Sequence, residues 1–252
     1  MIDCHSHILP HFDDGAKNTE TALKMLSESF SQGVTDVIST SHCYPRCAED
    51  ILRFTAARND AFLKLKNVIK ESGAELPKLY SAAELNMLTD VSEYEEIADI
   101  CINNTNYILI EMPMTAWKEW MIEAIYKLIV KGYRPVMAHI DRYLAQDRRQ
   151  LEALHELDVL YQLNTEALLN SHMRHYALDM IEGGYVHLLG TDMHNLTSRA
   201  PNMRAAAEML RKYFGEECLN YFNGNARAVL DGGNVSTEFF KPKSLLSRLM
   251  KK

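Results

Sequence analysis

The chain lacks the features that would mark it as a membrane, secreted or nucleic-acid-binding protein. Its 252 residues contain no run of about 18 apolar residues, so no transmembrane helix is expected. The N-terminus has no charged segment followed by an apolar one, which predicts no secretory signal. No basic run is long enough to follow a phosphate backbone and the net charge is −7, so we expect no nucleic-acid partner.

Cysteine is also scarce. The five cysteines are an odd number without disulfide-like spacing, which indicates reduced thiols and a cytoplasmic location. The 47% hydrophobic composition, by contrast, is enough for a large core. We interpret residues 1–252 as a single domain with a short basic amphipathic tail from about residue 235. The tail is either a loose end or a helix packed on the domain, and contact with a membrane surface or a partner is the alternative.

Strand-like and helix-like patterns alternate along the chain. Seven short β-rich runs predict strands over residues 2–4, 34–39, 79–82, 107–110, 135–138, 160–163 and 187–190. Amphipathic patterns predict helices over residues 19–33, 48–72, 91–101, 116–131, 147–157, 173–182, 201–213 and 216–222. Parallel β/α units with right-handed crossovers indicate an α/β protein with a closed or nearly closed barrel, and an open doubly wound sheet is the alternative.

The first predicted strand ends in two histidines. His5 and His7 are two residues apart, so in extended chain their imidazoles lie on the same side. Because neutral imidazole is the commonest metal ligand, the pair is a candidate two-point metal clamp. The pair alone could equally be two polar residues in a surface turn.

Most of the other predicted strands also end in a histidine or an acidic residue. These residues are His42, Glu84, Glu111, His139, Asp192 and His194. Each alone could be a helix cap or a salt-bridge partner. In a barrel, however, the strand ends meet at one mouth, where buried carboxylates and imidazoles need a cation to neutralise them. Mixed nitrogen and oxygen ligands suit zinc, manganese or iron, and two such ions can direct in-line attack on phosphorus.

The motifs occur in a specific order. They are His5-Ser6-His7, Asp13-Asp14-Gly15, Thr40-Ser41-His42, Glu84, Glu111, His139-Ile140-Asp141-Arg142-Tyr143, and Asp192-Met193-His194-Asn195 followed by Arg199-Ala200-Pro201. This set resembles the polymerase-and-histidinol-phosphatase (PHP) superfamily over residues 1 to about 230. It is most similar to the superfamily's bacterial protein-tyrosine phosphatases of capsule and exopolysaccharide systems.

The resemblance implies a distorted (β/α)7 barrel whose active site lies at the C-terminal ends of the strands and holds two or three divalent metal ions. By position, the first ion would be held by His5, His7, Glu84 and Asp192, the second by Asp14, His42 and His194, and the third by Glu84, Glu111 and His139. Asp13 is the alternative to Asp14. Many superfamily members have His in place of Asp14 and Glu111, and these harder oxygen ligands favour manganese or iron over zinc.

The resemblance also implies a reaction and a partner. The reaction is hydrolysis of phosphotyrosine on a protein by metal-hydroxide attack on phosphorus. The implied substrate is the tyrosine-rich tail of a bacterial tyrosine kinase of polysaccharide assembly. Arg142 and Arg199 are expected to bind the phosphoryl oxygens, because each guanidinium can grip two oxygens at once. His11 is a candidate general acid, and Trp117 and Trp120 are candidates for stacking on the substrate at the mouth.

Three alternatives compete with this interpretation. One is the same barrel acting on a small phosphomonoester such as histidinol phosphate. Another is a non-catalytic PHP binding module, which would be expected to have lost ligands, although none is missing here. The last is a thiol phosphatase, because Cys47 and Arg53 fit a cysteine-x5-arginine spacing. Glu49 and Asp50 between them would repel phosphate and raise the thiol pKa, so we interpret this match as chance.

Overall fold

The computed structural model describes residues 1–238 of the chain. The predicted basic tail therefore lies almost wholly outside the described residues. No helix in the described part is long and apolar enough to cross a lipid bilayer.

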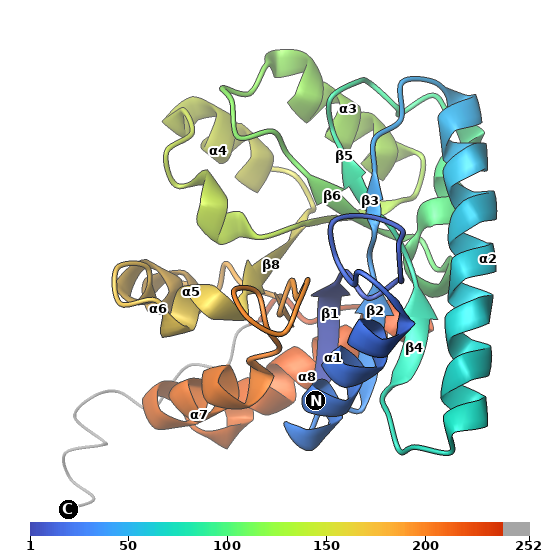
Figure 1. The fold of residues 1–252 in the computed structure, drawn as a ribbon. Helices are drawn as coiled ribbons and strands as arrows, with labels where there is room; N and C mark the ends of the chain where they lie inside the picture. Colours follow the sequence, from blue (N-terminus) through green and yellow to red (C-terminus); the bar gives the residue numbers. More distant parts are fainter. Residues whose placement is uncertain (239–252) are drawn as a thin grey trace, which may run out of the picture.

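A curled parallel sheet forms the centre of the molecule (Figure 1). Its strands are β1 (Ile2–Ser6), β2 (Asp36–Ser39), β3 (His42–Cys43), β4 (Lys78–Ser81), β5 (Glu84–Asn86), β6 (Tyr107–Glu111), β7 (Arg134–Met137), β8 (Leu160–Asn164) and β9 (Leu188–Gly190). All neighbouring strands pair in parallel, in the orders β1-β2-β4 and β3-β5-β6-β7-β8-β9. Each of β2 and β4 continues after a two-residue break as β3 and β5, so the nine segments occupy seven strand positions, as predicted.

The ring of strands closes between its two ends. The backbone N–H of Asp192, just after β9, donates to the carbonyl of His5 at 2.8 Å, and that of His7 donates to Met193 at 2.9 Å. The result is the expected distorted (β/α)7 barrel rather than an open doubly wound sheet. Strand ends that an open sheet would spread along a line therefore face one another around the same mouth.

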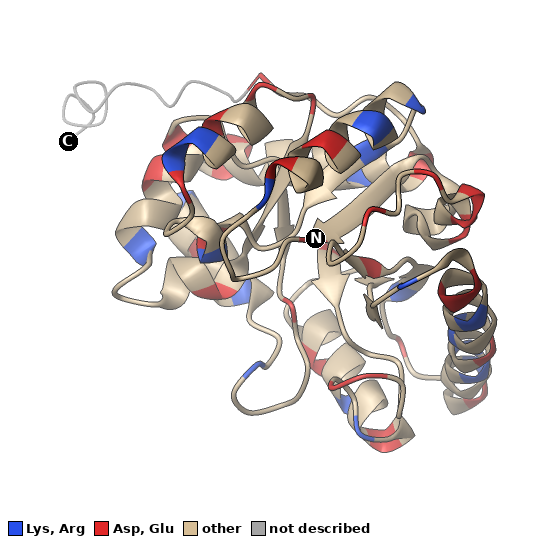
Figure 2. Cartoon of the chain, turned by 90° about the horizontal axis from the view of Figure 1, so that it is seen from above, with Lys and Arg blue, Asp and Glu red and all other residues tan. Residues whose placement is uncertain are grey.

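Helices surround the sheet (Figure 1). They are α1 (Thr19–Ser31), α2 (Ala48–Ser72), α3 (Glu119–Val130), α4 (Arg148–His155), α5 (Thr165–Leu169), α6 (Arg174–Glu182), α7 (Met203–Phe214) and α8 (Glu216–Asp231), with the 3-10 helices η1 (Glu95–Ile100), η2 (Ile102–Asn104) and η3 (Ile140–Tyr143). The long helix α2 has the predicted bounds because Gly73 ends it in the left-handed region, at φ 62°. In Figure 2, basic and acidic residues are interspersed along these outer helices.

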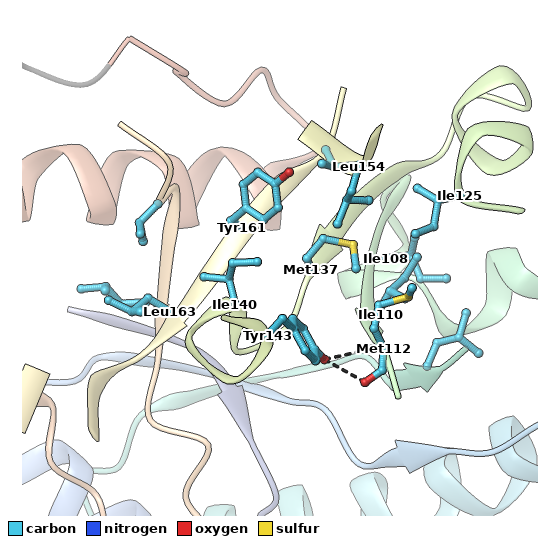
Figure 3. Close-up of a cluster of buried hydrophobic side chains, with 14 of the residues drawn as sticks. Ile108, Ile110, Met112, Ile125, Met137, Ile140, Tyr143, Leu154, Tyr161 and Leu163 are labelled. Atoms are coloured by element: carbon cyan, nitrogen blue, oxygen red, sulfur yellow. Dashed lines mark hydrogen bonds between the residues drawn. The ribbon is translucent and has the colours of Figure 1, made fainter. Parts of the chain in front are cut away.

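Two apolar layers fix the strands. Alternate residues of each strand point to opposite faces, so Leu109, Val136 and Leu160 lie in one buried cluster with Val229 and Leu230 of α8. Their neighbours on the same strands, including Ile108, Ile110, Met137 and Tyr161, form the cluster shown in Figure 3 with residues of α3 and α4. Side chains two residues apart on a strand point to the same face of the sheet. Glu111, two residues after Leu109, and Gln162, two residues after Leu160, therefore lie on the same face as the first cluster.

Two helix predictions were wrong. Residues 91–101 contain only the short η1, and the Asp99 carbonyl accepts a hydrogen bond from the Arg58 guanidinium at 2.9 Å instead of continuing a helical ladder. The last helix runs to Asp231 rather than ending at residue 222, because the buried face beyond Gly224 packs against the barrel. The short helices α5, η2 and η3 were not predicted.

Candidate metal centre

Four predicted ligands converge at the mouth of the barrel. The Nε2 atoms of His5 and His7 are 3.2 Å apart. They lie 3.4 and 3.3 Å from Glu84 Oε2, and each is 3.4 Å from Asp192 Oδ1. Ligand atoms roughly 2.1 Å from a tetrahedrally coordinated ion are themselves roughly 3.4 Å apart. The spacing of these four atoms therefore fits a single metal ion between them.

In His5, His7 and His194 the Nδ1 atom is engaged in a hydrogen bond, which leaves the Nε2 atom free to bind a metal ion. His5 Nδ1 lies 3.0 Å from Gln162 Oε1, an oxygen that also accepts the backbone N–H of His139 at 2.8 Å. His7 Nδ1 donates to Asp13 Oδ2 at 2.9 Å, and His194 Nδ1 donates to the Asp192 carbonyl at 2.8 Å. Hydrogen bonds of this kind fix the tautomer of metal-binding histidines.

A second group of donors adjoins the first. Asp14 Oδ1 lies 3.4 Å from His42 Nε2 and 3.3 Å from His194 Nε2. With His7, these residues offer donor atoms that all lie within 4.8 Å of one another. Asp13, in contrast, faces His7 Nδ1 and also accepts the backbone N–H of Gly15. The geometry therefore favours Asp14 over Asp13 as a donor at this position.

Glu84 connects the remaining predicted ligands. Its Oε1 atom lies 2.8 Å from His139 Nε2, and its Oε2 atom lies 2.9 Å from His42 Nδ1. Glu111 Oε1 lies 3.5 Å from His139 Nε2, while Glu111 Oε2 accepts from the side-chain amide of Asn86 at 2.7 Å. All nine predicted ligands thus lie in one cluster with Glu84 at its centre.

The electrostatics of this cluster fit a cation. Burial opposes ionisation of Glu84, but the neighbouring histidines outweigh it and hold the pKa of that carboxyl well below its usual value. Burial also opposes charge on His7, yet its contacts with Asp13, Asp192 and Glu84 raise the His7 pKa well above the usual value. Buried carboxylates therefore favour positive charge between these side chains. Glu84 Oε2 and His194 Nε2 are buried and have no hydrogen-bond partner, as expected for atoms that bind an ion.

Both predicted arginines lie beside the donors. Arg142 Nη2 and Arg199 Nη2 lie 2.5 and 2.6 Å from Asp192 Oδ2, the carboxylate oxygen that does not face His5 and His7. Each arginine side chain is about one-third exposed, at 33% and 31%. Arg142 belongs to η3, which Tyr143 fastens to the barrel by hydrogen bonds with the backbone of Met112 (Figure 3). Two cationic groups are thus held at the edge of the cluster, within reach of solvent.

The backbone adopts unusual conformations around the donors. His139 and Asp192 have positive φ angles of 36° and 53°, which residues other than glycine rarely adopt. Gly15 and Gly190 pass so close to the ligands that a Cβ atom would lie 2.1 Å from the His7 carbonyl oxygen and 2.5 Å from His5 Cβ, respectively. Such strain at strand ends is typical of functional sites.

Two further predictions do not agree with the structure. Trp117 is buried, packs edge-on against Tyr143 and donates its indole N–H to the Pro113 carbonyl, so it is not available to stack on a substrate. Trp120 packs on the same buried cluster. His11 is exposed and lines a surface hollow with Asp60 and Lys64 of α2, and its role as a general acid stays a prediction.

A family model described as capsular polysaccharide synthesis, CpsB/CapC, matches residues 1–231. The chain belongs to this family.

Curated relatives and a solved structure agree. The tyrosine-protein phosphatase CpsB of Streptococcus agalactiae serotype V is 30% identical over 248 residues, which cover 91% of this chain and 98% of the relative. The tyrosine-protein phosphatase YwqE of Bacillus subtilis is 28% identical over 242 residues, 91% of each chain. A solved structure matches with a TM-score of 0.81 and 27% identity, over 97% of this chain and all of the other chain. It comes from crystal structures of B. subtilis YwqE and Streptococcus pneumoniae CpsB, which are described as unique metal-dependent tyrosine phosphatases. The predicted resemblance is therefore confirmed.

The thiol alternative does not fit this CpsB/CapC family member. The pKa of Cys47 is raised, mainly by its hydrogen bond with Glu49, which outweighs the opposing effect of the Asp50 backbone N–H. Arg53, which would have to bind phosphate, is paired with Asp50. A reactive thiol needs a lowered pKa and a free cation, and Cys47 has neither.

Two residues that orient the site were missed from the sequence. Gln162 is fully buried on β8, and its Nε2 donates to Asn164 Oδ1 at 3.0 Å. Asn164 Nδ2 in turn donates to Asp192 Oδ2 at 3.0 Å. β8 carries amides where other strands carry ligands. Their position at a strand end was the available signal, but an amide side chain does not ionise and so does not indicate a metal ligand.

Proposed function

We propose that this chain is a metal-dependent phosphatase that hydrolyses phosphotyrosine on a protein. The observation that carries the proposal is the meeting of nine nitrogen- and oxygen-donor side chains at one mouth, beside two arginines that share Asp192 Oδ2. Family membership and the tyrosine phosphatase activity of the relatives support the same conclusion.

The ligands divide into three sets, and Glu84 belongs to the first and the third. The first set is His5, His7, Glu84 and Asp192, the second is Asp14, His42 and His194, and the third is Glu84, Glu111 and His139. We assign two or three divalent ions to these sets. Manganese or iron is preferred over zinc, because carboxylate oxygens make up a large share of the donors.

The protein's own residues then complete the chemistry. Divalent ions held by these residues would lower the pKa of coordinated water and so would supply hydroxide as the nucleophile at neutral pH. Arg142 and Arg199 bind the non-bridging phosphoryl oxygens and stabilise the charge that builds up on them in the transition state. A phenolate leaving group has a conjugate acid of pKa about 10, so it departs with less help from a general acid than an alkoxide needs.

The exposure of the site supports a protein substrate. Asp14 is 62% exposed, and both arginines face the solvent at the rim, so a tyrosine on a protein segment can reach the donors. A small phosphomonoester such as histidinol phosphate would gain affinity mainly from an enclosing pocket. We assign as substrate the tyrosine-rich tail of a bacterial tyrosine kinase of polysaccharide assembly.

The test is metal analysis combined with activity on one preparation. The enzyme should hydrolyse a phosphotyrosyl peptide with higher kcat/KM than a phosphoseryl peptide or histidinol phosphate. A chelator should abolish this activity, and added manganese or iron should restore it. The Cys47→Ser variant should retain it. Preference for histidinol phosphate, or a folded but inactive Cys47→Ser variant, would overturn the proposal.

A further inference from the structure

Large apolar side chains are exposed on the loops that surround the candidate metal centre. Five of them, which we call the apolar collar, are Tyr44 (56% exposed), Leu88 (58%), Met114 (66%), Leu144 (44%) and Leu196 (39%). They follow β3, β5, β6, η3 after β7, and β9, in that order. Because the C-terminal ends of these strands meet at the mouth, the collar surrounds the donors.

Tyr44 is the aromatic member of the collar and contacts the centre directly. Its ring stacks on His42, with centroids 5.3 Å apart and planes inclined by 30°. A tyrosine phenol, with an ordinary pKa of about 10, is neutral at neutral pH and does not repel a phosphate. Tyr44 therefore presents an uncharged aromatic face where Trp117 and Trp120 do not.

The collar loops are held in place by hydrogen bonds. The Thr89 hydroxyl, next to Leu88, donates to the carbonyl of Pro45, next to Tyr44, at 2.8 Å. Gln146, in the loop of Leu144, donates to the carbonyl of Thr115, next to Met114, at 3.1 Å. A surface fixed in this way loses little conformational entropy when a ligand binds.

The charges at the mouth restrict what can bind there. The two rim arginines converge on Asp192, where a phosphoryl group would meet them. Around them the collar is uncharged, and the exposed Asp14 adds a negative charge. Apolar residues beside the phosphotyrosine would therefore find exposed apolar surface around the centre.

We infer that the collar binds a phosphotyrosyl segment whose residues next to the phosphotyrosine are apolar. Tyr44 stacks on the phenyl ring of the phosphotyrosine, and Leu88 and Met114 contact the flanking side chains. This inference rests on the proposed function and names the chemistry of its substrate. It makes Tyr44 a specificity-determining residue that acts on the aryl group and not on the phosphoryl group.

The experiment compares substrates and variants of the metal-loaded enzyme. The substrates are two phosphotyrosyl pentapeptides, with leucine or glycine on both sides of the phosphotyrosine, and the alkyl ester glycerol 2-phosphate. The variants are Tyr44→Ala, Tyr44→Phe, and the control Tyr126→Ala, which removes an equally exposed tyrosine (54%) from α3. Metal content is measured for each, because Tyr44 touches the ligand His42.

The expected result is a split between KM and kcat. Tyr44→Ala should raise KM for both phosphotyrosyl peptides by about 10-fold, because it removes an aromatic pair and the apolar area that the pair buries. It should leave kcat and metal content unchanged. Tyr44→Phe and Tyr126→Ala should behave as wild type, and KM for glycerol 2-phosphate should not respond to Tyr44→Ala. The leucine-flanked peptide should have the higher kcat/KM, and a Leu88→Ser, Met114→Ser double variant should lose this preference.

Two results would overturn the inference alone. One is an equal rise of KM for the aryl and alkyl substrates in Tyr44→Ala, or a loss of metal with kcat, because Tyr44 would then only support His42. The other is equal kcat/KM for the two peptides in the wild-type enzyme. A wild-type enzyme that hydrolyses neither peptide would refute the proposed function itself, and the inference with it.

Discussion

Gln162 should control metal affinity although it is not assigned as a ligand. Its Oε1 atom accepts from His5 Nδ1 and from the His139 backbone, and its Nε2 atom donates to Asn164. Gln162→Leu keeps a similar volume and removes all three hydrogen bonds. Residues that orient metal ligands contribute about 10–100-fold to metal affinity, so the variant should lose affinity by that factor.

The same substitution should destabilise the metal-free protein. Gln162 is fully buried, so its partners cannot turn to water. Each buried polar group left unpaired costs about 1–3 kcal/mol, and with three such groups we expect a loss of about 3–5 kcal/mol, since the Asn164 amide can partly readjust. Urea unfolding in the presence of a chelator measures this free energy.

The matched control for Gln162→Leu is Gln162→Glu. It keeps an oxygen that accepts from His5 and from the His139 backbone, and it loses only the donor to Asn164. It should therefore retain more metal than Gln162→Leu in competition with a chelator. The reasoning is refuted if Gln162→Leu binds metal as tightly as the wild-type protein.

Three further predictions concern other parts of the site and barrel. Glu84→Ala should lose metal and activity together, because Glu84 lies between the donor sets; full metal content by elemental analysis would contradict this. Arg142→Ala and Arg199→Ala should each keep their metal and lower kcat by about 10²-fold, and steady-state kinetics with metal analysis would expose any loss of metal instead. Burial and then His155 lower the pKa of His187 to about 4. As the pH falls from about 6.5 to about 4, the unfolded chain therefore binds a proton at this residue that the folded chain does not. The free energy of unfolding should fall over this range by up to about 3 kcal/mol. His187→Asn, which can still accept the backbone N–H that His187 Nδ1 accepts at 3.1 Å, should remove that part of the pH dependence in urea unfolding, and an unchanged pH profile would count against it.

The sequence predicts the strands well because each strand is a short apolar run closed by a polar residue. The two-residue breaks after β2 and β4 did not affect the prediction of seven strand positions, because each interrupted strand continues in the same direction as β3 or β5. The local sequence pattern does not predict the structure correctly where contacts between distant residues determine the backbone conformation. The bond from Arg58 to the Asp99 carbonyl links residues 41 positions apart, and no pattern in residues 91–101 reveals it. The Gly224 position looks like a helix end, but packing of the following turns outweighs the roughly 1 kcal/mol cost of a helical glycine.

The candidate ligands could be predicted because a barrel brings all its strand ends to one place. Their orientation could not. Asp13 and Asp14 are adjacent and chemically identical in the sequence, and only the course of the loop turns Asp13 to His7 and Asp14 to His42 and His194. The burial of Trp117 likewise depends on its packing against Tyr143, which is 26 residues away in the chain.

Asp192 explains how the metal donors and the arginines act together. Its Oδ1 atom faces His5 and His7, and its Oδ2 atom accepts from both arginines and from Asn164. A metal ion bound at Oδ1 would withdraw charge from the carboxylate and weaken its hold on the two guanidiniums, which can then turn to a phosphoryl group. In the proposed role, both guanidiniums would start from a position beside the donors, so less entropy would be lost in the transition state. Contact with both the metal donors and the arginines requires one carboxylate between these two groups. This requirement explains why Asp192, just after the end of β9, adopts a φ angle of 53°, which aspartate seldom adopts.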